Sequence, residues 1–107
     1  MKNRIIIEKM LSYCEKVHEY SKELNYDEFV SQTMVLEACI FNLLQLGELV
    51  SKIDKVYIED NEQIPWKAIR GLRHRLVHNY EGVNLELVWD IIKNDLPDLQ
   101  ASLKQLT

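Results

Sequence analysis

The sequence predicts an all-α fold, a four- to five-helix antiparallel bundle. The 107 residues include only three glycines and two prolines, the residues that most often interrupt helices. No segment shows the apolar–polar alternation, bounded by turn residues, that is typical of a β-hairpin. Apolar residues instead recur every three or four positions along most of the chain, as on the buried face of a helix. We therefore expect one domain over residues 1–107.

The first helix is expected over residues 3–24, where apolar and aromatic side chains follow one helical stripe. A stripe of this kind predicts one buried face and one face in water. Its members are Ile6, Met10, Tyr13, Val17, Tyr20 and Leu24.

The second helix is expected to begin after Asn25 and to run to about Ile53. Asn25 and Glu28 have the spacing of a capping box, in which each side chain binds the other residue's backbone N–H. From Met34 to Leu46, ten of thirteen residues are apolar. A helix that is apolar on nearly all sides needs partners on nearly all sides. This favours a homodimer packed through the second and third helices, and a position wholly inside one bundle is the alternative.

Two further helices are expected after a polar connection over residues 54–63. Pro65 suits the first turn of the third helix, and Asn84 can cap the fourth. Pro97 either kinks the fourth helix or marks a new start at Asp95. The third stripe contains Trp66, Ile69, Leu76 and Tyr80, with Arg73 in the same register, and the fourth contains Leu85, Val88, Ile92, Leu96, Leu99, Leu103 and Leu106.

Positive charge is concentrated in the third helix. The formal net charge is −4, yet the segment from Pro65 to Tyr80 has four basic residues and no acidic one, so it carries +4 and the rest −8. The simpler interpretation is a solvated basic face, and the alternative is a local anion site on an acidic body. The four basic residues are Lys67, Arg70, Arg73 and Arg75.

Within this segment, Arg73, His78 and Tyr80 form a candidate chemical motif. Arginine is a permanent cation that suits phosphate oxygens, and histidine can move protons near neutral pH. Together they can cleave a phosphodiester without a metal ion. On an ideal helix, however, Arg73 and His78 lie roughly 140° apart and about 7.5 Å along the axis. Either the helix ends near His78, or a second copy of the segment completes the site.

Other features predict a cytoplasmic protein without a metal or cofactor. We find no signal peptide and no apolar run long enough to span a bilayer. Cys14 and Cys39 lie in apolar patterns without metal-ligand spacing, as expected for reduced core cysteines. His74 and His78 are four apart, but zinc needs further ligands that the sequence does not offer.

These residues resemble the HepT-like branch of the HEPN superfamily, whose motif is an arginine, four residues, a histidine, any residue and a tyrosine. Here the motif runs from Arg73 to Tyr80, and Trp66, the segment 82–85 and Val88-Trp89 flank it in a similar way. Leu46-Gly47-Glu48 in the second helix also matches a common feature of that branch. The resemblance covers the chain from the second helix onward. One position departs, because many members have asparagine where this chain has His74.

The resemblance implies a HEPN-like, dimerising fold and a ribonuclease toxin of a type VII-like toxin–antitoxin pair, with two motifs facing each other across the dimer. It also implies an MntA-like nucleotidyltransferase antitoxin that silences the toxin by transferring AMP to Tyr80. In this mechanism His78 takes the proton of an RNA 2′-OH and Arg73 stabilises the charge on the phosphate. The product is then a cyclic phosphate, and DNA is spared.

Each candidate residue also has a simpler interpretation. Tyr80 suits a core position with a wet hydroxyl. Glu48 is either a surface residue or the partner of Arg73 from the neighbouring helix. Arg70, His74 and Arg75 steer RNA or are merely solvated. The alternative function is a non-catalytic helical subunit that docks with a nucleotidyltransferase or presents substrate to it.

Overall fold

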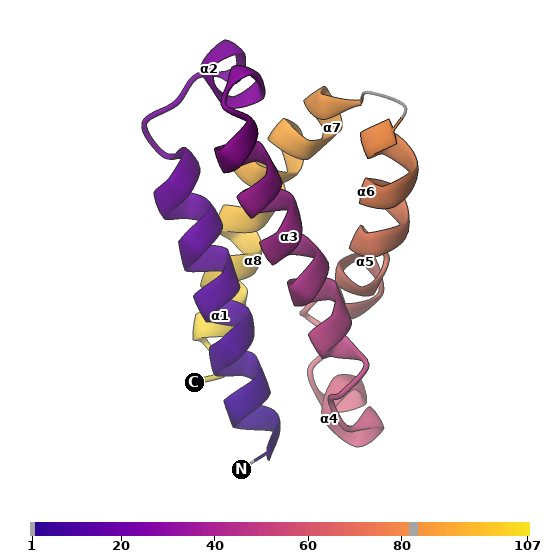
Figure 1. Cartoon of the computed structure of the whole chain (residues 1–107). Coiled ribbons are helices and arrows are strands. Elements are labelled where there is room, and N and C mark those ends of the chain that lie inside the picture. The colour runs from indigo at the N-terminus through magenta and orange to yellow at the C-terminus, as the bar shows by residue number, and fades with distance from the viewer. Residues whose placement is uncertain (1, 82–83) are drawn as a thin grey trace.

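A computed structural model describes residues 2–81 and 84–107, and the side chains of residues 2–76 and 84–107. These residues form helices and no strand, which confirms the all-α class. The helices form four legs, namely α1, α2 with α3, α5 with α6, and α7 with η1 and α8. These legs stand side by side with alternating directions (Figure 1), and α3 lies at the centre. The elements are α1 (Lys2–Ser21), α2 (Tyr26–Ser31), α3 (Thr33–Val50), α4 (Lys55–Asp60), α5 (Trp66–Arg70), α6 (Leu72–Glu81), α7 (Leu85–Asp90), the π-helical turn η1 (Ile91–Asp95) and α8 (Leu96–Lys104).

Helix α1 buries a face slightly rotated from the predicted stripe. Its fully buried centre follows Ile7, Cys14 and Ser21, a seven-residue repeat. Tyr13 and Tyr20 stand one position before these residues and therefore lie at the edge of the buried face, where Tyr20 is 42% exposed. The prediction that Tyr20 is a core residue is wrong. The helix also ends three residues earlier than expected, at Ser21, whose hydroxyl donates to the Val17 carbonyl at 2.7 Å.

The capping box after α1 is confirmed, but the helix that it starts is short. The Glu28 N–H donates to Asn25 Oδ1 at 2.8 Å, and the Asn25 N–H donates to Glu28 Oε1 at 3.0 Å. Helix α2 ends at Ser31, because the φ of −98° and ψ of 87° at Gln32 lie outside the helical region. The single helix expected from Asn25 to Ile53 is therefore two helices. The break lets Phe29 of α2 pack on Trp89 of α7, with ring centroids 4.9 Å apart.

Helix α3 is covered largely by its own chain. It packs on α1, α2, α5 and α6, and half of its residues are buried. Contrary to the sequence-based expectation, α3 is long and apolar enough by length and composition to cross a membrane, and its central position in the bundle accounts for that character. The exposed apolar surface of α3 is a narrow strip formed by Met34, which is 86% exposed, and Phe41, which is 57% exposed.

The third leg differs from the single helix that was expected. The polar connection contains α4, from which Tyr57 packs edge-on against Trp66 at 6.4 Å. Pro65 precedes α5 as its N-cap residue, and the leg is interrupted at Gly71, between α5 and α6.

The fourth leg is closer to the prediction. Asn84 caps α7 by accepting from the Leu87 N–H at 3.1 Å. Pro97 lies in the first turn of α8, which confirms a new start near Asp95, and the turn η1 joins the two helices. In η1 the helical turn contains one more residue than an α-helical turn, so the Leu96 N–H donates to the Ile91 carbonyl oxygen, five residues earlier.

Candidate active site

Helix α6 carries the predicted motif, and Arg73 stands on its solvent side. Leu72 and Leu76 hold α6 to the core, with 5% and 0% exposure. The Arg73 side chain is 67% exposed, so the prediction that it shares the buried stripe is wrong. A break at Gly71 separates α5 from α6, and Arg73 lies outside the buried face that Ile69, Leu72 and Leu76 form.

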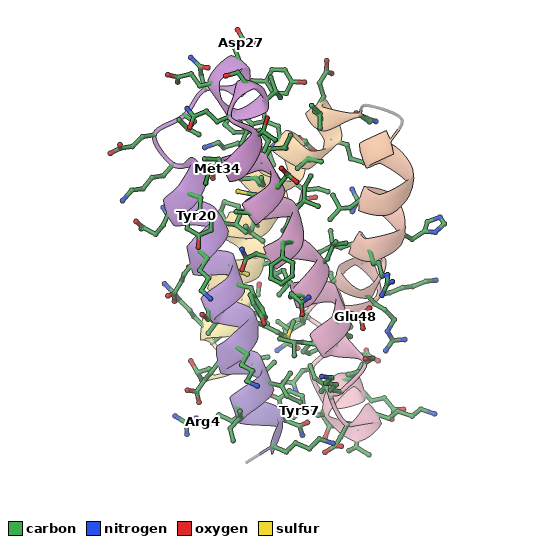
Figure 2. The ribbon with its side chains drawn as sticks, viewed as in Figure 1. Arg4, Tyr20, Asp27, Met34, Glu48 and Tyr57 are labelled. Atoms are coloured by element: carbon green, nitrogen blue, oxygen red, sulfur yellow. The ribbon has the colours of Figure 1, made fainter. Side chains whose placement is uncertain are left out.

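Arg73 makes an ion pair with Glu48 of α3. Arg73 Nη1 lies 2.7 Å from Glu48 Oε1, the distance of a charge-assisted hydrogen bond. The Glu48 side chain is 47% exposed, and it lies on the side of α3 that faces α5 and α6 (Figure 2). The predicted pairing of these two residues is therefore present. Because both groups remain in water, the pair orients the guanidinium but contributes at most about 1 kcal/mol to stability.

Gly47 explains how α3 comes close enough for this contact. A Cβ atom at Gly47 would lie 2.9 Å from the Ile69 carbonyl oxygen in α5, closer than real Cβ atoms approach. Leu46 is fully buried on one side of this glycine, and Glu48 follows it on the exposed side. The segment Leu46-Gly47-Glu48 thus supplies a core anchor, a close helix contact and the partner of Arg73.

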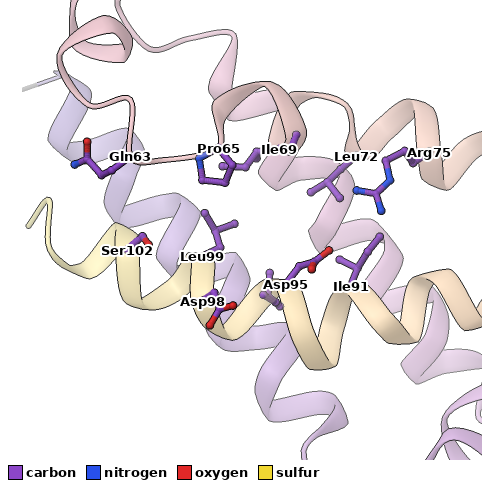
Figure 3. A pocket seen from close by; sticks show the side chains of 12 residues that line it. Gln63, Pro65, Ile69, Leu72, Arg75, Ile91, Asp95, Asp98, Leu99 and Ser102 are labelled. Carbon is purple, nitrogen blue, oxygen red and sulfur yellow. The ribbon is translucent and has the colours of Figure 1, made fainter.

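The basic side chains of α5 and α6 divide between two faces. Lys67, Arg70 and His74 are exposed, as is Arg73, and they follow each other at intervals of three or four residues. Arg75 is half-buried and instead lines a groove against η1 and α8 (Figure 3). Arg75 therefore lies apart from the other basic residues of this segment. Lys67 is exposed with the other three, as its spacing of three residues from Arg70 indicates.

His78 and Tyr80 belong to α6 by their backbone, and their side chains lie outside the described residues. Helix α6 continues to Glu81, three residues beyond His78. The idea that the helix ends near His78, so that the chain turns the imidazole towards Arg73, is therefore wrong. Positions 73 and 78 keep the roughly 140° separation of an ideal helix.

Neither the cysteines nor the acidic residues build a metal site in the described part of the chain, where no group of three potential ligands occurs. Cys14 and Cys39 are free thiols buried in the core, as predicted. Burial raises the pKa of Cys14 to about 12 and that of Cys39 to about 11. These thiols are therefore protonated and poor ligands at neutral pH.

Comparison with known proteins places the chain in a family. The family described as ribonuclease HepT-like matches residues 10–106. A relative from Caldanaerobacter subterraneus subsp. tengcongensis, named as a candidate RNase, is 32% identical over 96% of this chain and 92% of its own. A second, also named as a candidate RNase, is from Methanocaldococcus jannaschii and is 33% identical over 89% of this chain and 87% of its own. A protein of Thermococcus cleftensis named as a probable ribonuclease HepT is 26% identical over 94% and 91%. No solved structure matches the chain significantly.

Proposed function

Since this chain belongs to the family of HepT-like ribonucleases, we propose that it is a metal-independent RNA endonuclease with Arg73 and His78 as catalytic residues. The observation that carries this proposal is the exposed Arg73, held by Glu48 at 2.7 Å on the helix that also contains His78. Lys67, Arg70 and His74 extend the positive charge along the same leg and suit the RNA backbone.

In the proposed reaction the His78 imidazole takes the proton of an RNA 2′-OH. The 2′-oxygen attacks the adjacent phosphorus, the bond to the 5′-oxygen breaks, and that oxygen leaves with a proton from an imidazolium or water. Arg73 offsets the negative charge that develops on the phosphate oxygens. Glu48 is a positioning residue, because it orients Arg73 without reaching the substrate itself. The products are a 2′,3′-cyclic phosphate and a free 5′-hydroxyl.

We also propose that a second copy of the chain completes the site. Positions 73 and 78 do not share a face of the continuous helix α6, so Arg73 of one copy would act with His78 of the other. Met34 and Phe41 on α3 offer an exposed apolar strip on the leg next to α6. Two such strips related by a two-fold axis would cover each other.

This composite site is testable with mixed dimers. Arg73→Ala and His78→Ala chains are each inactive alone, but a mixed dimer keeps one intact site. After unfolding and refolding together in equal amounts, about a quarter of the wild-type activity should return, because half of the dimers are mixed and each has one site. No recovery in a mixture that contains mixed dimers would contradict the arrangement.

For regulation, we propose that a nucleotidyltransferase antitoxin, MntA-like and cytoplasmic with the toxin, transfers AMP from ATP to Tyr80. The phenol oxygen would attack the α-phosphorus and release pyrophosphate. The new phosphodiester would add negative charge two residues from His78 and repel RNA by the same electrostatics that otherwise attract it.

The primary experiment is RNA cleavage by the purified protein with EDTA present. Activity should persist with the chelator and fall by about 10² or more in Arg73→Ala and in His78→Ala, because each removes an electrostatic or proton-transfer contribution. Arg4→Ala is the matched control, since Arg4 is also an exposed arginine with one carboxylate partner, Glu8, at 3.4 Å. Cleavage that both site variants retain would contradict Arg73 and His78 as the catalytic residues, and no cleavage by the wild type would support the non-catalytic subunit.

A further inference from the structure

A groove on the opposite side of the motif helix has no role in the proposed reaction. It lies between α5 and α6 on one side and η1 and α8 on the other, and its volume is about 470 Å³. Figure 3 shows Arg75 and Ile91 at one end and Gln63 and Ser102 at the other. Helices α5 and α6 pack mainly on α3, so the groove separates them from the fourth leg.

The floor of the groove is apolar and its open wall is acidic. Ile69, Leu72 and Leu99 are among the side chains of the floor. Asp95 and Asp98 line the wall formed by η1 and α8, and both are exposed. Within the part of the chain that the structure describes, neither carboxylate has a hydrogen bond or ion pair. Arg75, at one end of the groove, is the one basic side chain among the described residues of the lining, so with Asp95 and Asp98 the lining carries a net charge of −1. Two carboxylates beside apolar surface, away from that end, favour an occupant that is apolar and positively charged.

The length of the groove indicates what kind of occupant fits. It follows the fourth leg from Ile91 to Ser102, which corresponds to about 16 Å at the rise of a helix. An extended chain of about five residues has this length, at roughly 3.3 Å per residue. A volume in the usual range of ligand sites would hold its apolar side chains.

We propose that this groove binds a short segment of a partner protein in which leucine or isoleucine alternates with lysine or arginine. The apolar side chains lie on the floor, and the basic side chains reach Asp95 and Asp98. The occupant touches α6 on the face away from Arg73, so the site is separate from the proposed catalytic site and does not depend on its activity.

Three blocked pentapeptides test the charge preference directly: acetyl-Leu-Lys-Leu-Lys-Leu-amide and its counterparts with glutamine or glutamate for lysine. Binding is followed by methyl NMR of the isoleucine and leucine side chains. The lysine peptide should shift the methyl signals of Ile69, Leu72 and Leu99 in a saturable way, and the glutamate peptide should not. Equal binding of all three peptides, or shifts confined to α3 around Phe41, would overturn the proposal.

Variants locate the site. Asp95→Asn with Asp98→Asn should weaken binding of the lysine peptide about three- to tenfold, the usual effect of removing two exposed ion pairs. Glu59→Gln with Asp60→Asn removes two exposed carboxylates from α4 and should leave it unchanged.

A second pair of variants tests the groove itself. Ala68→Trp should fill the groove and abolish binding, whereas Ala101→Trp, exposed on α8 outside the groove, should not. Far-UV circular dichroism confirms that both variants are folded. Unchanged binding in Ala68→Trp would contradict the location.

Discussion

The close contact at Gly47 gives a quantitative prediction for Gly47→Ala. The new Cβ would meet the Ile69 carbonyl oxygen at 2.9 Å, whereas ordinary contact begins at 3.4 Å, so α3 and α5 must part by about half an ångström. The obstacle is helix backbone, which cannot rotate away, so we take the upper part of the 1–3 kcal/mol range for overpacking. Alanine returns about 1 kcal/mol through its better helix propensity. The net loss of unfolding free energy should be about 1–2 kcal/mol.

Urea and thermal unfolding measure this loss. For a domain of this size, the expected fall in Tm is about 4 °C or more per kcal/mol. Gly71→Ala is the matched control, because Gly71 has helical φ and ψ and its Cβ would lie 3.3 Å from the nearest atom, so the same substitution should change stability little. A Gly47→Ala protein as stable as the wild type would refute the close contact, and with it the reason that Glu48 reaches Arg73.

Three further predictions concern single side chains. Glu48→Ala should lower kcat roughly tenfold while KM falls, because the site loses a negative charge and Arg73 loses its orientation. Glu48→Gln should restore part of kcat, and unchanged constants in both variants would contradict a positioning role. Tyr80→Phe should keep nuclease activity yet escape ATP-dependent silencing by the cognate nucleotidyltransferase, and mass spectrometry should find added AMP only on the wild type. Cys14 and Cys39, whose pKa values burial raises to about 12 and about 11, should both resist a thiol reagent at pH 8 until urea is added, and rapid labelling of the native protein would show that they are accessible.

Local rules predicted much of the fold from the sequence. The helical class, the Asn25–Glu28 capping box, the Asn84 cap and the fourth stripe all depend on spacing within a few residues. The break at Gln32 was missed, because it serves a tertiary contact between distant segments, and the break at Gly71 was missed as well. The break at Gln32 brings Phe29 of α2 to Trp89 of α7.

The candidate site was predictable as a motif and less so as a geometry. The spacing of Arg73, His78 and Tyr80 is visible in the sequence, and so is a carboxylate at Glu48 that could reach the neighbouring helix. The exposure of Arg73 and the separation of Arg75 from the other basic residues depend on how α6 packs against α3, η1 and α8, which spacing along the chain does not give. The acidic groove was not predicted, because its walls come from residues about thirty positions apart in the sequence.

The chemistry of the cleaved ends tests the central claim most directly. A defined RNA is incubated with the protein in EDTA, beside the same RNA with a 2′-deoxynucleotide on the 5′ side of the mapped cut, and the products are weighed by mass spectrometry. Because the proposed nucleophile is the RNA's own 2′-OH, the account predicts a 2′,3′-cyclic phosphate and a 5′-hydroxyl from the first RNA and no cut at that position in the second. Cleavage of the deoxy-substituted RNA at that position, or products with a 5′-phosphate that form only with a divalent metal, would contradict it.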